Sequence, residues 1–196
     1  MATLTARRPA QTKQAQTRGA SADRRPLTAA GFLLGVGMGG FVDGILFHQI
    51  LQAHNMLSNR LFPDTLVNVE INMFWDGLFH AFTWITTAVG LGLLWRAGAR
   101  ADVPWSGRTL VGAMLLGWGA FNLVEGVIDH HILALHHVVE RATGGAQLAA
   151  DLAFLGSGVV LIGIGLGLIR SAPKDAPPRG LAGPERETER EARPTA

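Results

Sequence analysis

Four long apolar stretches constrain this chain more than any other feature of its sequence. Each can cross a hydrocarbon core about 30 Å thick, which takes about 20 helical residues. We predict membrane-spanning helices at residues 27–51, 69–95, 109–135 and 146–169. Only helices and closed barrels satisfy every backbone hydrogen bond within a bilayer. The predicted fold class is therefore all-α, an integral membrane four-helix bundle that occupies residues 27–170.

The composition agrees with a membrane domain and excludes several chemistries. The chain has 25 glycines among 196 residues, and membrane helices use glycine freely. It has no cysteine, which excludes disulfides, thiolate metal ligands and cysteine nucleophiles. Residues 1–26 and 171–196 are rich in Arg, Pro, Thr and Ala, and we predict that both are disordered tails.

The basic residues predict the orientation in the membrane. The two tails and the connection between the second and third stretches hold 15 of the 17 Lys and Arg residues, and the other two connections hold only Arg60 and Arg141. The positive-inside rule then places both termini in the cytoplasm of a bacterial inner membrane protein. The first stretch is too long for a cleaved signal peptide. Basic residues confined to tails and one loop, with no recognition motif, exclude nucleic acid as a partner.

The first and third stretches share a motif that indicates an internal repeat. Residues 43–51 (DGILFHQIL) align with residues 125–133 (EGVIDHHIL) at a constant offset of 82, and His54 aligns with His136. The second and fourth stretches align more weakly, at an offset of 75. The pairs there are Asn72 with Gln147, Asp76 with Asp151, Phe79 with Phe154 and Gly90 with Gly165. We predict two parallel two-helix repeats, related by an axis along the membrane normal.

Histidines and carboxylates gather in the predicted outward half of the four helices. Charged groups within a bilayer are costly and usually face a bundle interior or a cavity, so this recurrence is the strongest functional signal. Interhelical hydrogen bonds that only fix packing are the alternative. On an ideal helix His48 lies about 140° from Asp43. Unless the helix is locally unwound, these two belong to different clusters or to a wide cavity. The predicted metal ligands are Asp43, His48, His54, Asp76, His80, Glu125, His130, His131 and His136.

Imidazole and carboxylate ligands without thiolates suit zinc, copper, iron or manganese. Four-helix bundles commonly build such centres from inward Glu and His side chains. Haem b between two helices is the alternative cofactor, with His48 and His130 as axial ligands. We predict that His80→Ala reduces ligand binding at least as much as His54→Ala, because His54 is expected at the wet edge of the membrane. Small-residue stripes at Gly31, Gly35 and Gly39 and at Gly163 and Gly167 predict close helix packing.

Three segments carry a resemblance to a known family. They are residues 39–54 (GGFVDGILFHQILQAH), 75–80 (WDGLFH) and 122–131 (NLVEGVIDHH). These segments resemble the bacterial membrane family catalogued as domain of unknown function 2243, over about residues 28–170. The resemblance implies a multi-pass membrane protein. Family members look to be encoded near cytochrome oxidase assembly genes, which implies metal or haem handling with respiratory oxidase components as partners. The motif residues implied are Asp43, His48, His54, Asp76, His80, Glu125, His130, His131, His136 and His137.

Three functions are compatible with the sequence. The first is a membrane metal or cofactor-binding protein that serves oxidase assembly or a redox or hydrolytic reaction. The second is an ion or proton pathway, but the inward halves of the helices hold no ionisable residue to complete it. The third is a scaffold or assembly subunit without a ligand of its own.

Overall fold

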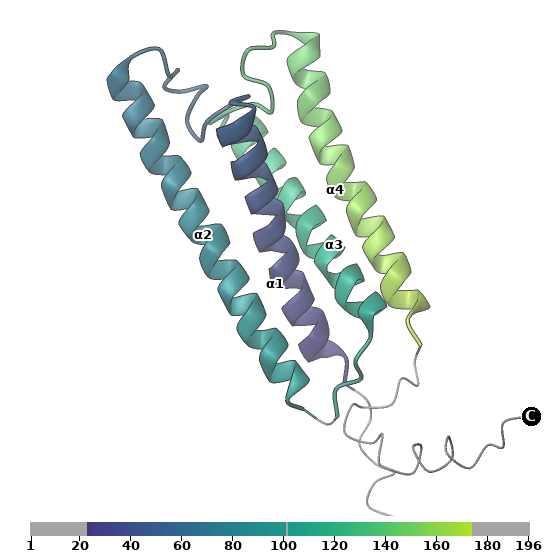
Figure 1. The fold of residues 1–196 in the computed structure, drawn as a ribbon. Coiled ribbons are helices and arrows are strands. Elements are labelled where there is room, and N and C mark those ends of the chain that lie inside the picture. The colour runs from purple at the N-terminus through teal and green to yellow at the C-terminus, as the bar shows by residue number, and fades with distance from the viewer. Residues whose placement is uncertain (1–22, 101, 174–196) are drawn as a thin grey trace, which may run out of the picture.

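The computed structural model describes residues 23–100 and 102–173, and these residues form four long helical rods (Figure 1). Two of the rods change to π-helix at one end: η1 continues α1, and η2 continues α3. The elements are α1 (Arg25–Val42), η1 (Asp43–Ile50), α2 (Leu66–Gly98), α3 (Gly107–Glu125), η2 (Gly126–Ile132) and α4 (Gly145–Ser171).

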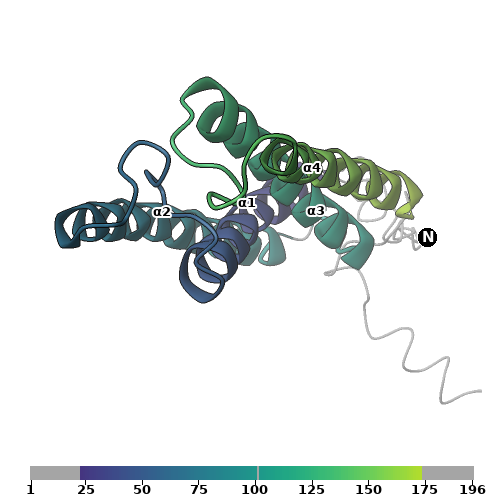
Figure 2. The same ribbon diagram turned by 90° about the horizontal axis from the view of Figure 1, so that it is seen from above.

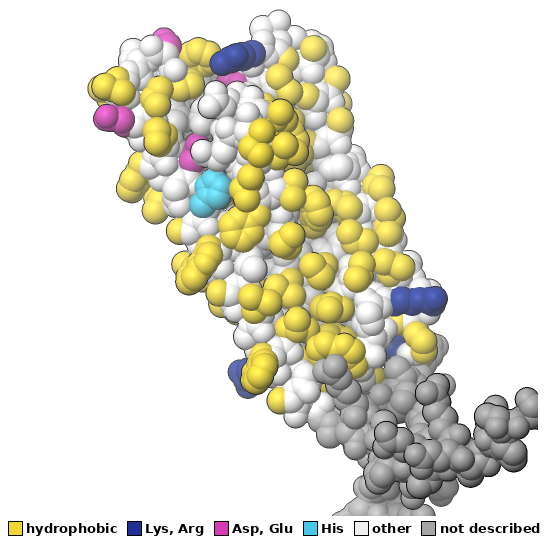
Figure 3. Space-filling view, viewed as in Figure 1, with side chains coloured by type: hydrophobic (Ala, Val, Ile, Leu, Met, Phe, Trp, Pro, Cys, Tyr) yellow, Lys and Arg dark blue, Asp and Glu magenta, His cyan; other side chains and the backbone are white. Residues whose placement is uncertain are grey.

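The prediction of an all-α fold with four long apolar helices is confirmed. All four rods are long and apolar enough to cross a membrane. Apolar side chains are spread along the whole face in Figure 3, and the charged side chains visible there lie toward its two ends. The helices begin and end within about four residues of the predicted bounds, and the predicted N-terminal tail loses its last two residues to α1. Almost all of both predicted tails lies outside the described residues.

Local sequence signals explain where the helices begin. Pro26 stands in the first turn of α1, where its missing N–H leaves no hydrogen bond unmade. The side chains of Thr65 and Ser106 accept hydrogen bonds from the backbone N–H groups of Asn68 and Thr109, which caps α2 and α3.

The helices lie side by side in the order α2, α1, α3, α4, as Figure 2 shows from above. Contacts join α2 to α1, α1 to α3, and α3 to α4, and the described residues make no contact between other pairs of these four helices. In a closed four-helix bundle each helix would touch two neighbours. Here α1 and α3 form the centre, while α2 and α4 each turn a wide apolar face outward.

Glycines allow the central helices to touch through their backbones. A methyl group added at Gly35 would lie 1.9 Å from the carbonyl oxygen of Met114, and one added at Gly117 would lie 1.9 Å from that of Phe32. The predicted stripe on the first helix is therefore confirmed as a packing surface. The prediction for Gly163 and Gly167 is wrong, because both face open space. At the α3–α4 contact Gly158 and Gly165 take that role instead.

Candidate metal centre

Two loops close over the ends of η1 and η2 and carry two histidines inward. The loop after η1 bonds to the loop after η2 through Asn59 N–H to Leu135 O (2.9 Å) and Glu140 N–H to Ala53 O (3.0 Å). His54 and His136 lie in these loops and are 2% and 0% exposed. The expectation that His54 lies at the wet edge of the membrane is wrong, because the interlocked loops shield both histidines from solvent.

Each loop histidine is oriented by a backbone carbonyl of the opposite loop. Nδ1 of His54 donates to Val138 O (3.0 Å), and Nδ1 of His136 donates to Met56 O (3.1 Å). A carbonyl only accepts, so the proton is on Nδ1 and the lone pair is on Nε2. The two rings stack with their centroids 4.5 Å apart, and both Nε2 atoms are left free to bind a ligand.

The π-helical segment brings His48 beside Asp43. On a regular α-helix these side chains would diverge, but π-helical i→i+5 bonding brings residues five apart together. Nε2 of His48 lies 3.1 Å from Oδ2 of Asp43, without the geometry of a hydrogen bond. The local unwinding on which the predicted cluster depends is therefore present.

Carboxylates of the two outer helices contact histidines of the cluster and the loops that carry them. Asp76 of α2 lies 2.9 Å from Nδ1 of His48, and it accepts hydrogen bonds from the backbone N–H of Met56 and the side chain of Asn55. On the other side, Asp151 of α4 accepts a hydrogen bond from the backbone N–H of Val138. It also lies 2.7 Å from Nδ1 of His137 and 3.7 Å from Nδ1 of His130.

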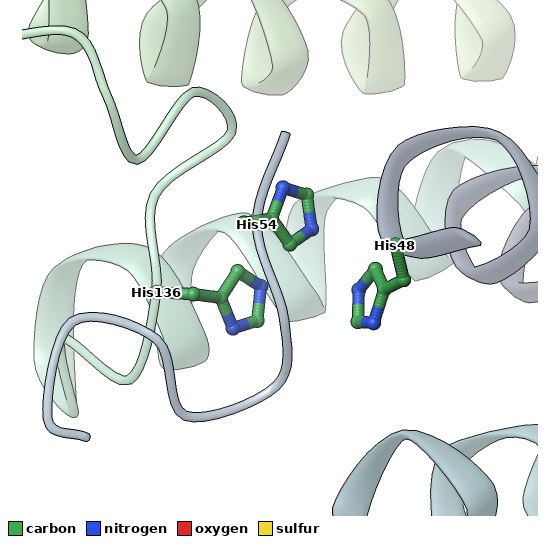
Figure 4. A group of neighbouring side chains, drawn as sticks. All are labelled: His48, His54 and His136. Atoms are coloured by element: carbon green, nitrogen blue, oxygen red, sulfur yellow. The ribbon is translucent and has the colours of Figure 1, made fainter. Parts of the chain in front are cut away.

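Most of the unsatisfied buried polar atoms of the described residues lie in this one cluster. Each such atom costs about 1–3 kcal/mol if nothing binds it. Figure 4 shows His48, His54 and His136, whose rings approach one another from η1 and the two loops. Three groups have ligand atoms within 4.8 Å of one another: His48 with His54 and His136, Glu125 with His130 and His136, and Asp43 with His48 and Glu125. The unsatisfied atoms are Asp43 Oδ2, His48 Nε2, His54 Nε2, Glu125 Oε1 and Oε2, His130 Nδ1 and Nε2, and His136 Nε2.

The loop histidines are held neutral. Burial lowers the pKa of His54 to about 3, and the neighbouring imidazoles of His136 and His48 contribute to this shift. Burial, together with the imidazole of His130, lowers the pKa of His136 to about 4. A metal ligand must be a neutral imidazole, so both side chains are in the protonation state that binding requires.

Six of the nine predicted ligands meet in the cluster, and three lie apart from it. Asp76 contacts Nδ1 of His48, whereas Nε2 of that ring faces the cluster. His80 is half-buried and donates to the backbone of its own helix at Asp76 O (2.8 Å). His131 is exposed and its Nδ1 bonds to Gly126 O. The six that meet are Asp43, His48, His54, Glu125, His130 and His136.

Sequence reasoning missed two supporting contacts. Asp151 is not among the predicted ligands, although its alignment with Asp76 indicates an equivalent role. Ser58 and Glu140, which also align at the offset of 82, meet where the loops cross, at 3.1 Å. A cavity of about 390 Å³ beside these loops is lined in part by His48 and His54.

The fold and the cluster define a class: an integral membrane protein of four apolar helices with a buried histidine and carboxylate cluster that can hold a metal ion. Residues 30–172 match the family described as predicted membrane protein DUF2243, and the chain belongs to that family. The resemblance found in the sequence is thereby confirmed. No curated protein matches the chain, and no solved structure matches it.

Proposed function

We propose that this protein binds metal ions in the membrane through the Nε2 atoms of four histidines and the carboxylates of Asp43 and Glu125. One observation carries the proposal: the inward Nε2 atoms have no hydrogen-bond partner among the described residues. Metal-binding histidines typically donate their other ring nitrogen to a carbonyl or carboxylate, and His48, His54 and His136 have such partners. The donor set suits zinc, manganese, iron or copper.

The charge balance supports two divalent ions in this centre. The carboxylates of Asp43, Asp76, Glu125 and Asp151 are all buried, and no Lys or Arg of the described residues is buried with them. Buried charges are stable only when they are paired. Metal binding requires neutral imidazoles and ionised carboxylates. In that state the four carboxylates leave a deficit of four positive charges, which two divalent cations would balance. Paired metal ions about 3.5–4 Å apart, bridged by shared ligands, are common in enzymes.

An internal repeat would account for the form of the centre. The bonds from His54 to Val138 and from His136 to Met56 connect positions that differ by 82 at both ends. The loops also share a left-handed residue at the same offset, Gln52 with φ 48° and Ala134 with φ 46°. These correspondences support two copies of one hairpin, with the metal centre on the axis between them.

The same geometry favours metal ions over the other candidates. A haem ligated by His48 would compete with Asp43, which stands 3.1 Å from Nε2. A proton pathway needs ionisable groups along its whole length, whereas the buried ionisable residues of the described chain all lie toward the loops that carry His54 and His136. We also propose that this end faces outward in a bacterial cytoplasmic membrane, where such a centre could serve respiratory oxidase components.

Elemental analysis tests the proposal directly. The purified protein in detergent is dialysed against zinc, manganese, iron(II) or copper(II), and bound metal is counted per chain. We expect about two ions in the wild type and in a His80→Ala, His131→Ala control, which removes two histidines outside the cluster. We expect the His48→Ala, His130→Ala variant to lose them. One ion per chain would overturn the two-ion centre, and no bound metal in the wild type would overturn the whole proposal.

A further inference from the structure

A second cavity adjoins the cluster on a different face of the molecule. It has a volume of about 420 Å³ and lies between α1, α2 and α3. Phe82 is 52% exposed and Val124 is 59% exposed, so the cavity opens where the helices meet lipid. Its size and apolar lining are typical of small-molecule sites. The phenylalanines that line it are Phe32, Phe79, Phe82 and Phe121.

Two carboxylates interrupt this apolar lining at one end. Glu125 is 4% exposed, and neither of its oxygens has a hydrogen-bond partner among the described residues. Asp129 is half-buried, and its side chain has no hydrogen bond or ion pair within the described chain. A carboxylate facing lipid is costly, and a ligand that donates a hydrogen bond would lower that cost. Glu125 also belongs to the metal cluster, so the cavity reaches the centre itself.

The equivalent place on the other half of the molecule is filled. At the offset of 82, Val36 corresponds to Trp118 and Asp129 corresponds to Phe47. The ring of Trp118 packs against Gly39, where an added methyl group would lie 2.7 Å from it. Packing of the helices therefore does not require an open cavity with an acidic end. The position equivalent to Val36 holds a larger side chain, Trp118, in the other half.

The cavity has its apolar end toward the middle of the span and its polar end toward the loops. An amphiphile in one leaflet of a bilayer has the same orientation. From Phe121 to Asp129 the lining rises by about 12 Å along the helix, from an apolar end near mid-span to the acidic end near the loops. The carboxylates would repel a phosphate headgroup and attract a hydrogen-bond donor. The phenylalanines favour an aromatic ring, which packs well against their faces and edges.

We propose that this cavity binds a hydroxylated aromatic compound dissolved in the bilayer, with its hydroxyl group directed at Asp129 and Glu125. That this compound is a substrate of the metal centre rests on the proposed function. Binding of the compound in the cavity does not depend on that function. The metal cluster would then adjoin two separate cavities, this one open toward lipid and the other beside His48.

Matched probes test the site in phosphatidylcholine nanodiscs. 4-Decylphenol and decylbenzene differ only in the hydroxyl group, and equilibrium binding of each is measured together with metal content. We expect saturable binding of 4-decylphenol, about one per chain, and at least about tenfold weaker binding of decylbenzene, the effect of one hydrogen bond to a charged group. Val36→Trp should abolish the binding, as Trp118 fills the other half. Val160→Trp, on the lipid face of α4, should leave it unchanged.

A second variant tests the site if Val36→Trp does not fold. Asp129→Leu should reduce the preference for 4-decylphenol over decylbenzene, because one of the two acceptors is lost while Glu125 and the apolar lining remain. Equal binding of both probes to the wild type, or undiminished 4-decylphenol binding by folded Val36→Trp, would overturn the proposal. Saturable phenol binding by a protein that holds no metal would support this site and overturn the metal centre alone.

Discussion

At the scale of single residues, the hydrogen-bond partner of Nδ1 decides whether a histidine directs Nε2 into the cluster. His54 and His136 direct Nε2 into the cluster because Nδ1 is held by a carbonyl of the opposite loop. His80 and His131 also bond through Nδ1, but to their own helices, so their rings stay with the helix surface. These four histidines of the predicted outward half therefore divide into two that face the cluster and two that do not.

This difference reverses the order that the sequence predicts for two variants. We expect His54→Ala to weaken metal binding at least about tenfold and His80→Ala to change it less, because only His54 contributes to a ligand group. The carbonyl of Val138 would also lose its donor. Isothermal titration of both variants with zinc measures the order. Normal binding by His54→Ala beside a defective His80→Ala would move the centre toward α2.

At the scale of elements, the π-helical ends and the glycine contacts position the site. The π-helices rotate the last residues of each central rod, which brings Asp43 and His48 together. Close contact between α1 and α3 then brings the two rod ends near enough to share ligands. The α1–α3 contact depends on the glycines that face the other helix's backbone.

We expect Gly35→Ala to destabilise the protein by about 1–3 kcal/mol, the usual range for overpacking. Its methyl group would lie 1.9 Å from Met114 O, so α1 and α3 must separate. Gly163→Ala is the matched control, because its methyl group would enter open space and alanine favours helix by about 0.5–1 kcal/mol. Thermal unfolding in detergent compares the two. Equal midpoints would show that the backbone contact contributes little.

At the scale of the whole molecule, the four helices form a row. The cluster lies where the two central rods end in η1 and η2. The outer helices contribute the supporting carboxylates Asp76 and Asp151, and the loops after η1 and η2 supply His54 and His136 from the two halves of the chain. The orientation of this end would determine from which side of the membrane metal ions reach the proposed centre.

Cysteine labelling tests the orientation without background, since the chain has no cysteine. We expect a membrane-impermeant maleimide to label Asp64→Cys on intact cells and to spare Arg100→Cys until the cells are opened. Both positions are exposed, at opposite ends of α2. The reverse pattern would place the metal centre on the cytoplasmic side.

The helices, their approximate bounds and the gathering of His, Asp and Glu toward one end follow from the sequence, because hydropathy and spacing along a helix are local properties. The assembly of six ligands does not. It depends on π-helical turns at Asp43 and Gly126, and on loops whose carbonyls orient histidines about eighty residues away. Those contacts are long-range, so only the tertiary structure decides that His54 is buried within the centre and that His80 stays outside it.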